Sequence, residues 1–233
     1  MIVLGIDTSG YINAVGISDG VNVLADASFP ARTDSLEQIV DNIDSVLKKA
    51  NLALKDVAGI GVGLGPGSWT GIKVGVTVGK MLAFSANKPV AGIPTLDALA
   101  YGVRDKSPLV CAVIGAGIRD TIYAAFYRFA NDLPVKEGDY FTGDAKDIAP
   151  LVKEPVTLVG SDANHYYELL TNEDKSLNTK IKALEATPSG AAVACLAAMR
   201  LKQGKADDTL SLMPLYLKES TAKVFVNKYS AKA

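Results

Sequence analysis

The sequence predicts an α/β protein of two similar halves, each with the element order β-β-β-α-β-α. Three observations carry this prediction. Short apolar runs with turn residues between them open the chain, and an amphipathic helical period follows them. A glycine-rich turn then separates an apolar strand from a second helix. The same order of patterns returns in the second half of the chain, although the two halves share no residue-level identity.

Composition excludes several classes of protein. The chain has 233 residues, of which 48% are hydrophobic and 21% are charged, so it is neither disordered nor a polyelectrolyte. A net charge of −1 gives no overall attraction to nucleic acid. Cys111 and Cys195 lie far apart in the sequence and do not have the spacing of metal ligands. We interpret both as buried free thiols in a reducing compartment. We find no signal peptide and no stretch that would cross a bilayer, and we expect a cytoplasmic protein without membrane contact.

Three strands are expected at the start of the chain, over Ile2–Ile6, Ala14–Ser18 and Val21–Ser28. The Asp19-Gly20 pair between the second and third strands is a strong hairpin signal. A helix over Ser35–Ala50 should follow, because its apolar residues recur with the helical period. These apolar residues are Leu36, Ile39, Val40, Ile43, Val46, Leu47 and Ala50.

The segment Gly65-Pro66-Gly67-Ser68-Trp69-Thr70-Gly71 lies between the strand Val57–Leu64 and a helix that ends near Ala86. Glycine lets other atoms approach closely, and the first N–H groups of a helix lack internal partners. The turn can therefore bind an anion or the backbone of a partner. The alternative is a tight turn without a ligand. It is not a Walker A loop, which would end in Gly-Lys-Ser/Thr.

Small residues form a stripe along this second helix, because Gly71, Gly75, Gly79 and Ala83 recur every four residues. Glycine costs roughly 0.8–1 kcal/mol in a helix interior. Such a stripe indicates a neighbour that packs very close to the helix. This neighbour is either a helix of another protein or an element of the same chain, namely the sheet or the first helix.

The pattern of the second half predicts a set of elements that corresponds to the first. The two halves are expected to join around residues 100–108. Expected strands are Leu109–Ile114, Thr121–Arg128, Val135–Phe141 and Val156–Gly160, and expected helices are 145–152, 163–171 and 189–203. From residue 211 we expect a short strand and a loose end. Two such halves indicate the actin/hexokinase/Hsp70-like ATPase architecture. The predicted domains are residues 1–103 and 104–217, followed by a tail over 218–233.

Three motifs resemble the TsaB (YeaZ) family. They are Ile6-Asp7-Thr8-Ser9, the turn Gly65–Gly71 with Lys73 and Gly75 after it, and Pro214-Leu215-Tyr216-Leu217-Lys218. The turn is similar to the family signature Gly-Pro-Gly-Ser-Phe-Thr-Gly, with Trp69 in place of Phe. The resemblance implies a non-catalytic scaffold subunit of the bacterial machinery that makes threonylcarbamoyladenosine in tRNA.

The resemblance also implies the partners. They are a TsaD-like catalytic subunit and a TsaE-like ATPase, with tRNA contacted only through the complex. We expect the two helices of the first half to form the partner face, and the same face to form a homodimer when the partner is absent. The expected interface residues are Leu36, Ile39, Val40, Ile43, Val46, Gly71, Lys73, Gly75, Val78 and Gly79.

A nucleotide or anion site is expected where the first strand meets the glycine turn. Asp7 would order a magnesium-bound water, while hydroxyls and N–H groups nearby would contact phosphate. The expected residues are Asp7, Thr8, Ser9, Gly65, Gly67, Ser68 and Thr70. The alternative for Asp7 is a bond that stabilises its own turn. We expect no cofactor of its own, although ATP or ADP with magnesium would fit at a subunit interface.

Catalytic residues and metal ligands are not expected. His165 is the single histidine, so the His-x-x-x-His metal motif of the related TsaD subunit is absent, and no nucleophile elbow accompanies it. A surface position is the simpler interpretation of this residue. The alternative function is an independent small-molecule kinase or ATPase of the same architecture, which would use Asp7 and the glycine loops.

Overall fold

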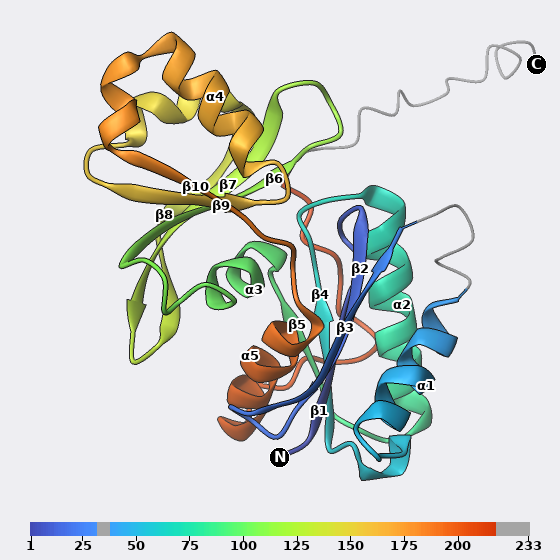
Figure 1. Cartoon of the computed structure of the whole chain (residues 1–233). Coiled ribbons are helices and arrows are strands. Elements are labelled where there is room, and N and C mark those ends of the chain that lie inside the picture. The colour runs from blue at the N-terminus through green and yellow to red at the C-terminus, as the bar shows by residue number, and fades with distance from the viewer. Residues whose placement is uncertain (32–37, 218–233) are drawn as a thin grey trace, which may run out of the picture.

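A computed structural model describes residues 1–31 and 38–217 of the chain. Two five-stranded sheets lie one above the other, with helices around them (Figure 1). The strands of the first sheet are β1 (Val3–Asp7), β2 (Ile12–Ser18), β3 (Val23–Pro30), β4 (Gly59–Gly63) and β5 (Val90–Ile93). Those of the second are β6 (Leu109–Gly115), β7 (Thr121–Ala130), β8 (Leu133–Asp144), β9 (Val156–Gly160) and β10 (Ile181–Glu185).

The two sheets repeat one topology. The first has the order β3-β2-β1-β4-β5 and the second the order β8-β7-β6-β9-β10. In each, the first three strands form an antiparallel meander, and the fourth strand pairs in parallel with the first. The predicted repeat is therefore confirmed. Each half also carries a fifth strand that the sequence patterns did not reveal. The last helix of the first half, α3 (Thr95–Tyr101), was missed as well, whereas that of the second half, α5 (Gly190–Lys202), lies within the predicted helix 189–203.

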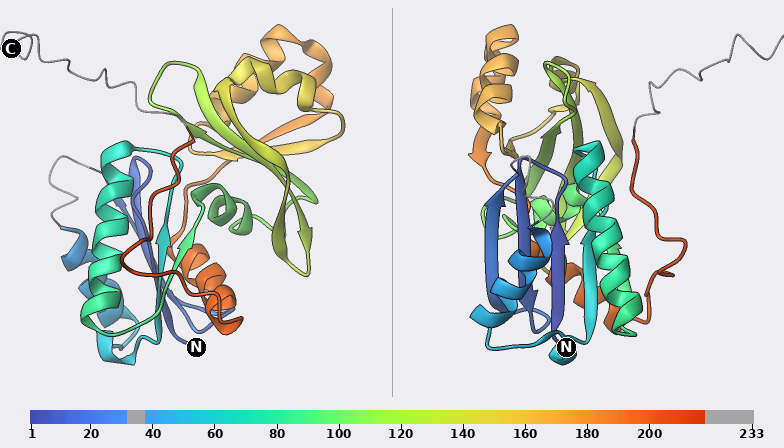
Figure 2. Two further views of the ribbon diagram at one scale, coloured as in Figure 1. Left: turned by 180° about the vertical axis from the view of Figure 1, so that it is seen from behind. Right: turned by 90° about the vertical axis from the view of Figure 1, so that its right-hand side faces the viewer.

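Helices cover both faces of the first sheet. On one face lie α1 (Ile39–Lys49) and α2 (Trp69–Ser85), and on the other lies α5 (Gly190–Lys202), as Figure 1 and the view from behind in Figure 2 show. Both packing layers are made of buried aliphatic side chains. α5 lies very close to the sheet, since a Cβ atom on Gly16 would come within 2.1 Å of the Ala191 backbone nitrogen.

Helices are exchanged across the predicted join at residues 103 and 104. α3 (Thr95–Tyr101) comes from the first half, yet Leu96 and Leu99 pack with Tyr127 of the second sheet. α5 comes from the second half and packs on the first sheet. The sheets, rather than the order of the chain, therefore define the two layers of the molecule.

The outer face of the second sheet carries α4 (Ala163–Glu173) and short 3₁₀ segments at Ala145–Leu151 and Lys175–Thr179, while Leu54–Asp56 forms another before β4. The segment Ala145–Leu151 was predicted as an α-helix. It contains Pro150, which has no N–H to donate and disfavours a continuous α-helix. Among residues 1–31 and 38–217, no helix is long and apolar enough to cross a membrane.

After α5 the chain returns along the first half, and we call residues 207–217 the strap (Figure 2). The backbone of Asp207 bridges to Val90 of β5, and Leu212 is buried in the core beneath α1 and α2. The Leu215 N–H donates to the carbonyl of Leu64 over 2.8 Å. The strand predicted from residue 211 is absent through residue 217, and residues 218–233 lie outside the described part of the chain.

Candidate functional site

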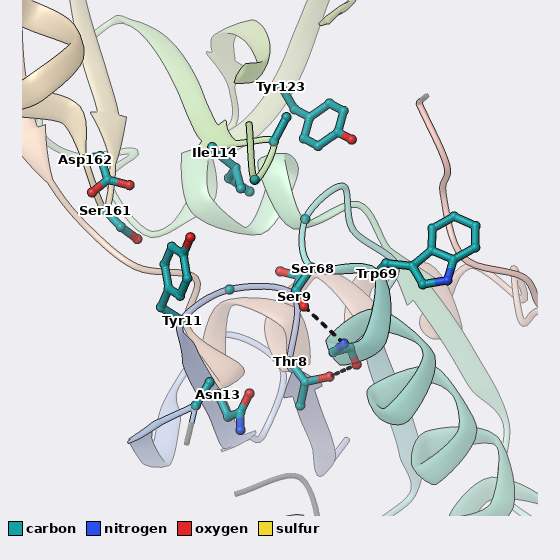
Figure 3. Close-up of a pocket in the computed structure, with 17 residues that line it drawn as sticks. Thr8, Ser9, Tyr11, Asn13, Ser68, Trp69, Ile114, Tyr123, Ser161 and Asp162 are labelled. Atoms are coloured by element: carbon teal, nitrogen blue, oxygen red, sulfur yellow. Dashed lines mark hydrogen bonds between the residues drawn. The ribbon is translucent and has the colours of Figure 1, made fainter. Parts of the chain in front are cut away.

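A cavity of about 440 Å³ lies between the two halves (Figure 3). One wall comes from the turn after β1, the start of β2 and the start of α2. The other comes from the end of β6, the loop after it and the residues before α4. The lining residues are Thr8, Ser9, Gly10, Tyr11, Asn13, Ala31, Gly67, Ser68, Trp69, Gly71, Ile114, Gly115, Ala116, Gly117, Tyr123, Ser161 and Asp162.

Asp7 lies beneath this cavity and is fully buried. Its Oδ1 accepts hydrogen bonds from the Ser9 N–H at 2.8 Å and the Ser9 hydroxyl at 2.6 Å. Its Oδ2 accepts one from the Thr95 hydroxyl at 2.8 Å. Burial raises the pKa of the Asp7 carboxyl, and these bonds oppose that rise. Asp7 does not line the cavity itself, and both its oxygens already accept hydrogen bonds, so its contact with a magnesium-bound water stays a prediction.

Thr8 and Ser9 line the cavity, but their hydroxyls donate elsewhere. Thr8 Oγ1 donates to the Gly71 carbonyl over 2.7 Å, and the Ser9 hydroxyl donates to Asp7. The Ser9 carbonyl accepts from the Ser68 N–H at 2.6 Å. These bonds fasten the turn after β1 to the start of α2, as the dashed lines in Figure 3 show in part.

The glycine turn is held tightly by its neighbours. Gly67 has φ +151°, and a Cβ atom there would lie 2.2 Å from the Ser9 carbonyl oxygen. The Gly65 N–H donates to Thr95 Oγ1 at 3.1 Å. Ser68 caps α2 by accepting a bond from the Gly71 N–H. Of the expected anion-site residues, Thr8, Ser9, Gly67 and Ser68 meet at the cavity, whereas Asp7, Gly65 and Thr70 do not line it.

Charge is sparse in the cavity wall. Within the part of the chain that the structure describes, Asp162 is the one acidic lining residue, and none of the lining residues is a lysine or an arginine. Three aromatic residues, Tyr11, Trp69 and Tyr123, also line the cavity. A phosphate here would meet the N-terminal N–H groups of α2 and no basic side chain of the described lining.

The single histidine lies on the first turn of α4, outside the cavity lining. His165 Nε2 is 3.0 Å from Asp120 Oδ1, and the imidazole is exposed. Among the residues that the structure describes, no three His, Cys, Asp or Glu side chains gather where they could share a metal ion.

Part of the expected partner face is buried inside this chain. Ile39, Ile43 and Val46 of α1 lie in the core of the first half, so they are not available to a partner. The reason is that α1 needs its apolar stripe to cover its own sheet. Val40 is 56% exposed, and Val78 is partly buried against the core. Leu36 lies outside the described residues.

The glycine stripe of α2 also faces inward, contrary to the expected partner role. A Cβ atom on Gly71 would lie 2.0 Å from the Thr8 carbonyl oxygen, and one on Gly75 would lie 2.3 Å from Thr8 Oγ1. A Cβ atom on Gly79 would lie 2.3 Å from Val62 Cγ2. The close neighbour that the stripe indicated is therefore the chain's own first sheet, with the turn after β1.

The outward face of α2 carries residues that the sequence reasoning missed. Met81 and Phe84 are 60% and 66% exposed, and Trp69 is also exposed. Lys73 lies on the same side, with its ammonium 4.3 Å from the Trp69 ring centroid. The helical spacing of positions 69, 73, 77, 81 and 84 was the available signal, because it is complementary to the glycine stripe.

Two sheets of one topology, helices exchanged between them and a cleft at the strand ends define an actin-like protein of the hexokinase and Hsp70 class, as predicted. A family model described as TsaD: tRNA N6-adenosine threonylcarbamoyltransferase matches residues 30–225, and the chain belongs to this family.

Relatives within the family refine this assignment. The chain is 26% identical over 225 residues to the tRNA threonylcarbamoyladenosine biosynthesis protein TsaB of Bacillus subtilis, covering 95% of this chain and 96% of that protein. It is 36% identical over 107 residues to the tRNA N6-adenosine threonylcarbamoyltransferase of Tropheryma whipplei, covering 40% and 27%. YeaZ from Pseudomonas aeruginosa has the same fold, with a TM-score of 0.76 at 21% identity over 93% of this chain and 99% of that one. The predicted TsaB (YeaZ) resemblance is confirmed.

Proposed function

We propose that this chain is a non-catalytic scaffold subunit in the synthesis of N6-threonylcarbamoyladenosine in tRNA, and that it pairs with a TsaD-like catalytic subunit. The observation that carries the proposal is the likeness to TsaB from end to end. By contrast, the chain covers only 27% of the matched threonylcarbamoyltransferase.

The interior of the cleft supports a non-catalytic role. In a kinase or ATPase of this architecture an acid on the first strand would face the nucleotide. Here Asp7 is buried, and both its oxygens accept bonds from Ser9 and Thr95. The described residues of the cavity wall also include no basic side chain to balance phosphate charge. Both features favour a structural task for the residues around β1.

The surface of α1 and α2 supports pairing with another protein. Val40, Met81 and Phe84 expose large apolar side chains to water. Exposed apolar groups on adjacent helices favour an interface, because covering them removes apolar area from water. The interface residues that we propose are these three together with Lys73 and Trp69. A TsaD-like protein has a related fold, so its equivalent helices would pack against this pair.

Further partners complete the proposal. A TsaE-like ATPase would join the pair, tRNA would be contacted only through the complex, and ATP or ADP with magnesium would bind at a subunit interface. Without its partner, the chain would form a homodimer through the same helices. Sedimentation over a range of concentrations tests the homodimer, and a monomer at high concentration would contradict it.

The decisive experiment is binding to the cognate TsaD-like protein, followed by a threonylcarbamoyl-transfer assay on tRNA with all subunits present. Met81→Asp should weaken binding by tenfold or more, since it buries a charge in an apolar contact. Leu151→Asp is the control, because Leu151 is also exposed, at 47% against 60% for Met81, but lies on the second half. A wild-type chain that neither binds this protein nor supports the transfer would refute the proposal.

A second candidate function is an independent ATPase. The observation in its favour is the cavity itself, whose glycine residues come from both halves. Turnover of ATP by the purified chain would support it if Asp162→Ala, at the cavity wall, abolished the turnover without lowering stability. Absence of turnover in the presence of magnesium would exclude it.

A further inference from the structure

The strap is fastened to α2 along most of its length. Lys80 Nζ donates hydrogen bonds to the carbonyls of Leu210 at 3.1 Å and Leu212 at 3.0 Å. Nearer the start of α2, the Tyr216 ring stacks on Trp69 with centroids 4.2 Å apart. Strap and helix therefore run side by side and present one surface.

The start of the strap is anchored separately. Asp207 Oδ2 accepts a bond from the Gly92 N–H at 2.7 Å, and its Oδ1 pairs with Arg200 at 3.0 Å. Its own N–H donates to the Val90 carbonyl. These contacts hold the strap at the edge of β5, so the position of the segment that follows is set by the fold.

Apolar side chains point outward from both parts of this surface. On the strap, Leu210 is 79% and Met213 is 66% exposed. On α2, Met81 and Phe84 are exposed to similar extents. A segment whose backbone is bonded to the protein while its leucine and methionine side chains face water is unusual for a surface without a function.

Charge indicates what covers this surface. The charged residues of α2 are two lysines, Lys73 and Lys80, and the helix contains no acid. The nearest strap acid, Asp208, accepts bonds from the N–H groups of Leu210 and Ser211. In the homodimer that is expected without the partner, the same patch would meet itself and bring lysines near lysines, so this dimer should be weaker than a pair with a different protein. A different protein with an apolar, acidic surface fits better.

We infer that the strap forms part of the docking surface for the TsaD-like subunit, so that this partner contacts α2 and residues 207–217 together. The inference rests on the proposed function and extends its interface beyond the two helices. Leu210 and Met213 supply apolar contacts, while Tyr216 holds Trp69 at the boundary between the docking surface and the cleft.

The test measures binding of the purified cognate TsaD-like protein to the full-length chain. The double variant Leu210→Asp, Met213→Asp should weaken binding about tenfold or more. Leu151→Asp, on the second half, should bind within about twofold of wild type. Trp69 is the single tryptophan, so its fluorescence should change as wild-type complex forms. Melting curves verify that each variant is folded. If the aspartate double variant does not fold, the milder double variant Leu210→Ser, Met213→Ser replaces it in the binding measurement.

The outcomes separate the two claims. If the strap variant binds normally while Met81→Asp does not, the strap inference fails and the proposed function stands. If the strap variant alters only self-association, a second copy covers the surface and the inference is overturned. If wild type does not bind the partner, the proposed function fails and the inference fails with it.

Discussion

Thr95 Oγ1 donates a hydrogen bond of 2.8 Å to Asp7 Oδ2, which joins the start of α3 to the end of β1. Thr95 also accepts from the Gly65 N–H and donates its own N–H to the Gly65 carbonyl. Three segments distant in sequence therefore meet at one buried carboxyl group. This arrangement makes Asp7 the centre of a structural network beneath the cleft.

Replacing Asp7 should chiefly destabilise the fold. Asp7→Ala leaves the Ser9 N–H, the Ser9 hydroxyl and the Thr95 hydroxyl without their acceptor. Unsatisfied buried donors cost about 1–3 kcal/mol each, so we expect a loss of roughly 3 kcal/mol. For a chain of this size that lowers the melting temperature by roughly 6–12 °C. Calorimetry measures this fall in melting temperature, with Asp162→Ala as the control at an exposed position. An unchanged melting temperature of Asp7→Ala would contradict the network.

Gly75 should tolerate no side chain. In Gly75→Val the new Cβ atom would lie 2.3 Å from Thr8 Oγ1, and overpacking of this kind costs about 1–3 kcal/mol. Urea unfolding should show this loss. Thr77→Val on the exposed side of α2 is the control and should be nearly neutral. Equal stability of both variants would mean that the stripe does not face the sheet.

Asp97 should make stability depend on pH. Its carboxylate accepts a 2.7 Å bond from the Tyr127 hydroxyl. Burial raises the pKa of Asp97, against the opposing effect of Tyr127, Tyr140 and Lys136. The folded state thus keeps its proton at pH values where the unfolded state has lost it. The free energy of unfolding must therefore fall as pH rises from the ordinary aspartate pKa through the folded one.

Asp97→Asn isolates this effect, because the amide does not titrate. As pH rises through that acidic window, the free energy of unfolding of wild type should fall relative to that of the variant. Above the window, the difference between the two should stay constant. Urea titrations at a series of pH values provide the measurement. A difference that is constant at every pH would rule out a raised pKa.

Tyr216→Ala should expose Trp69 to water and shift its emission to longer wavelength. The aromatic stack contributes about 0.5–1.5 kcal/mol beyond burial, so the melting temperature should fall by only a few degrees. Tyr167→Phe, on α4, should leave the emission unchanged. If Tyr216→Ala also leaves it unchanged, the strap does not rest on α2 in solution.

Much of the first half was predictable from local patterns. The helical period located α1 and α2, and the Asp19-Gly20 hairpin separated β2 from β3. β5 and α3 were missed because Val90–Ile93 is only four residues long and α3 seven. Such short elements carry too few residues for a period to be counted, and they form because the sheet edge and the second sheet cover them.

The candidate site was predictable only in part. The turn Gly65–Gly71 was correctly placed beside the residues after β1, and Thr8, Ser9, Gly67 and Ser68 do meet at the cavity. That Asp7 lies beneath this cavity depends on Thr95, which is distant in the chain and belonged to a helix that was not predicted. Hydrogen-bond partners of this kind come from topology, which local spacing does not encode.

By itself, the sequence determined the order of elements, the repeated architecture and the family, because periodicity, turn residues and motifs are local properties of the chain. Only the tertiary structure decided which face of each helix remains open. The glycine stripe, Ile39 and Ile43 turned inward because the nearest sheet is their own, and burying them there removes apolar surface from water. Met81 and Phe84 stayed exposed, as did Leu210 and Met213 of the strap, because no element among residues 1–31 and 38–217 covers them.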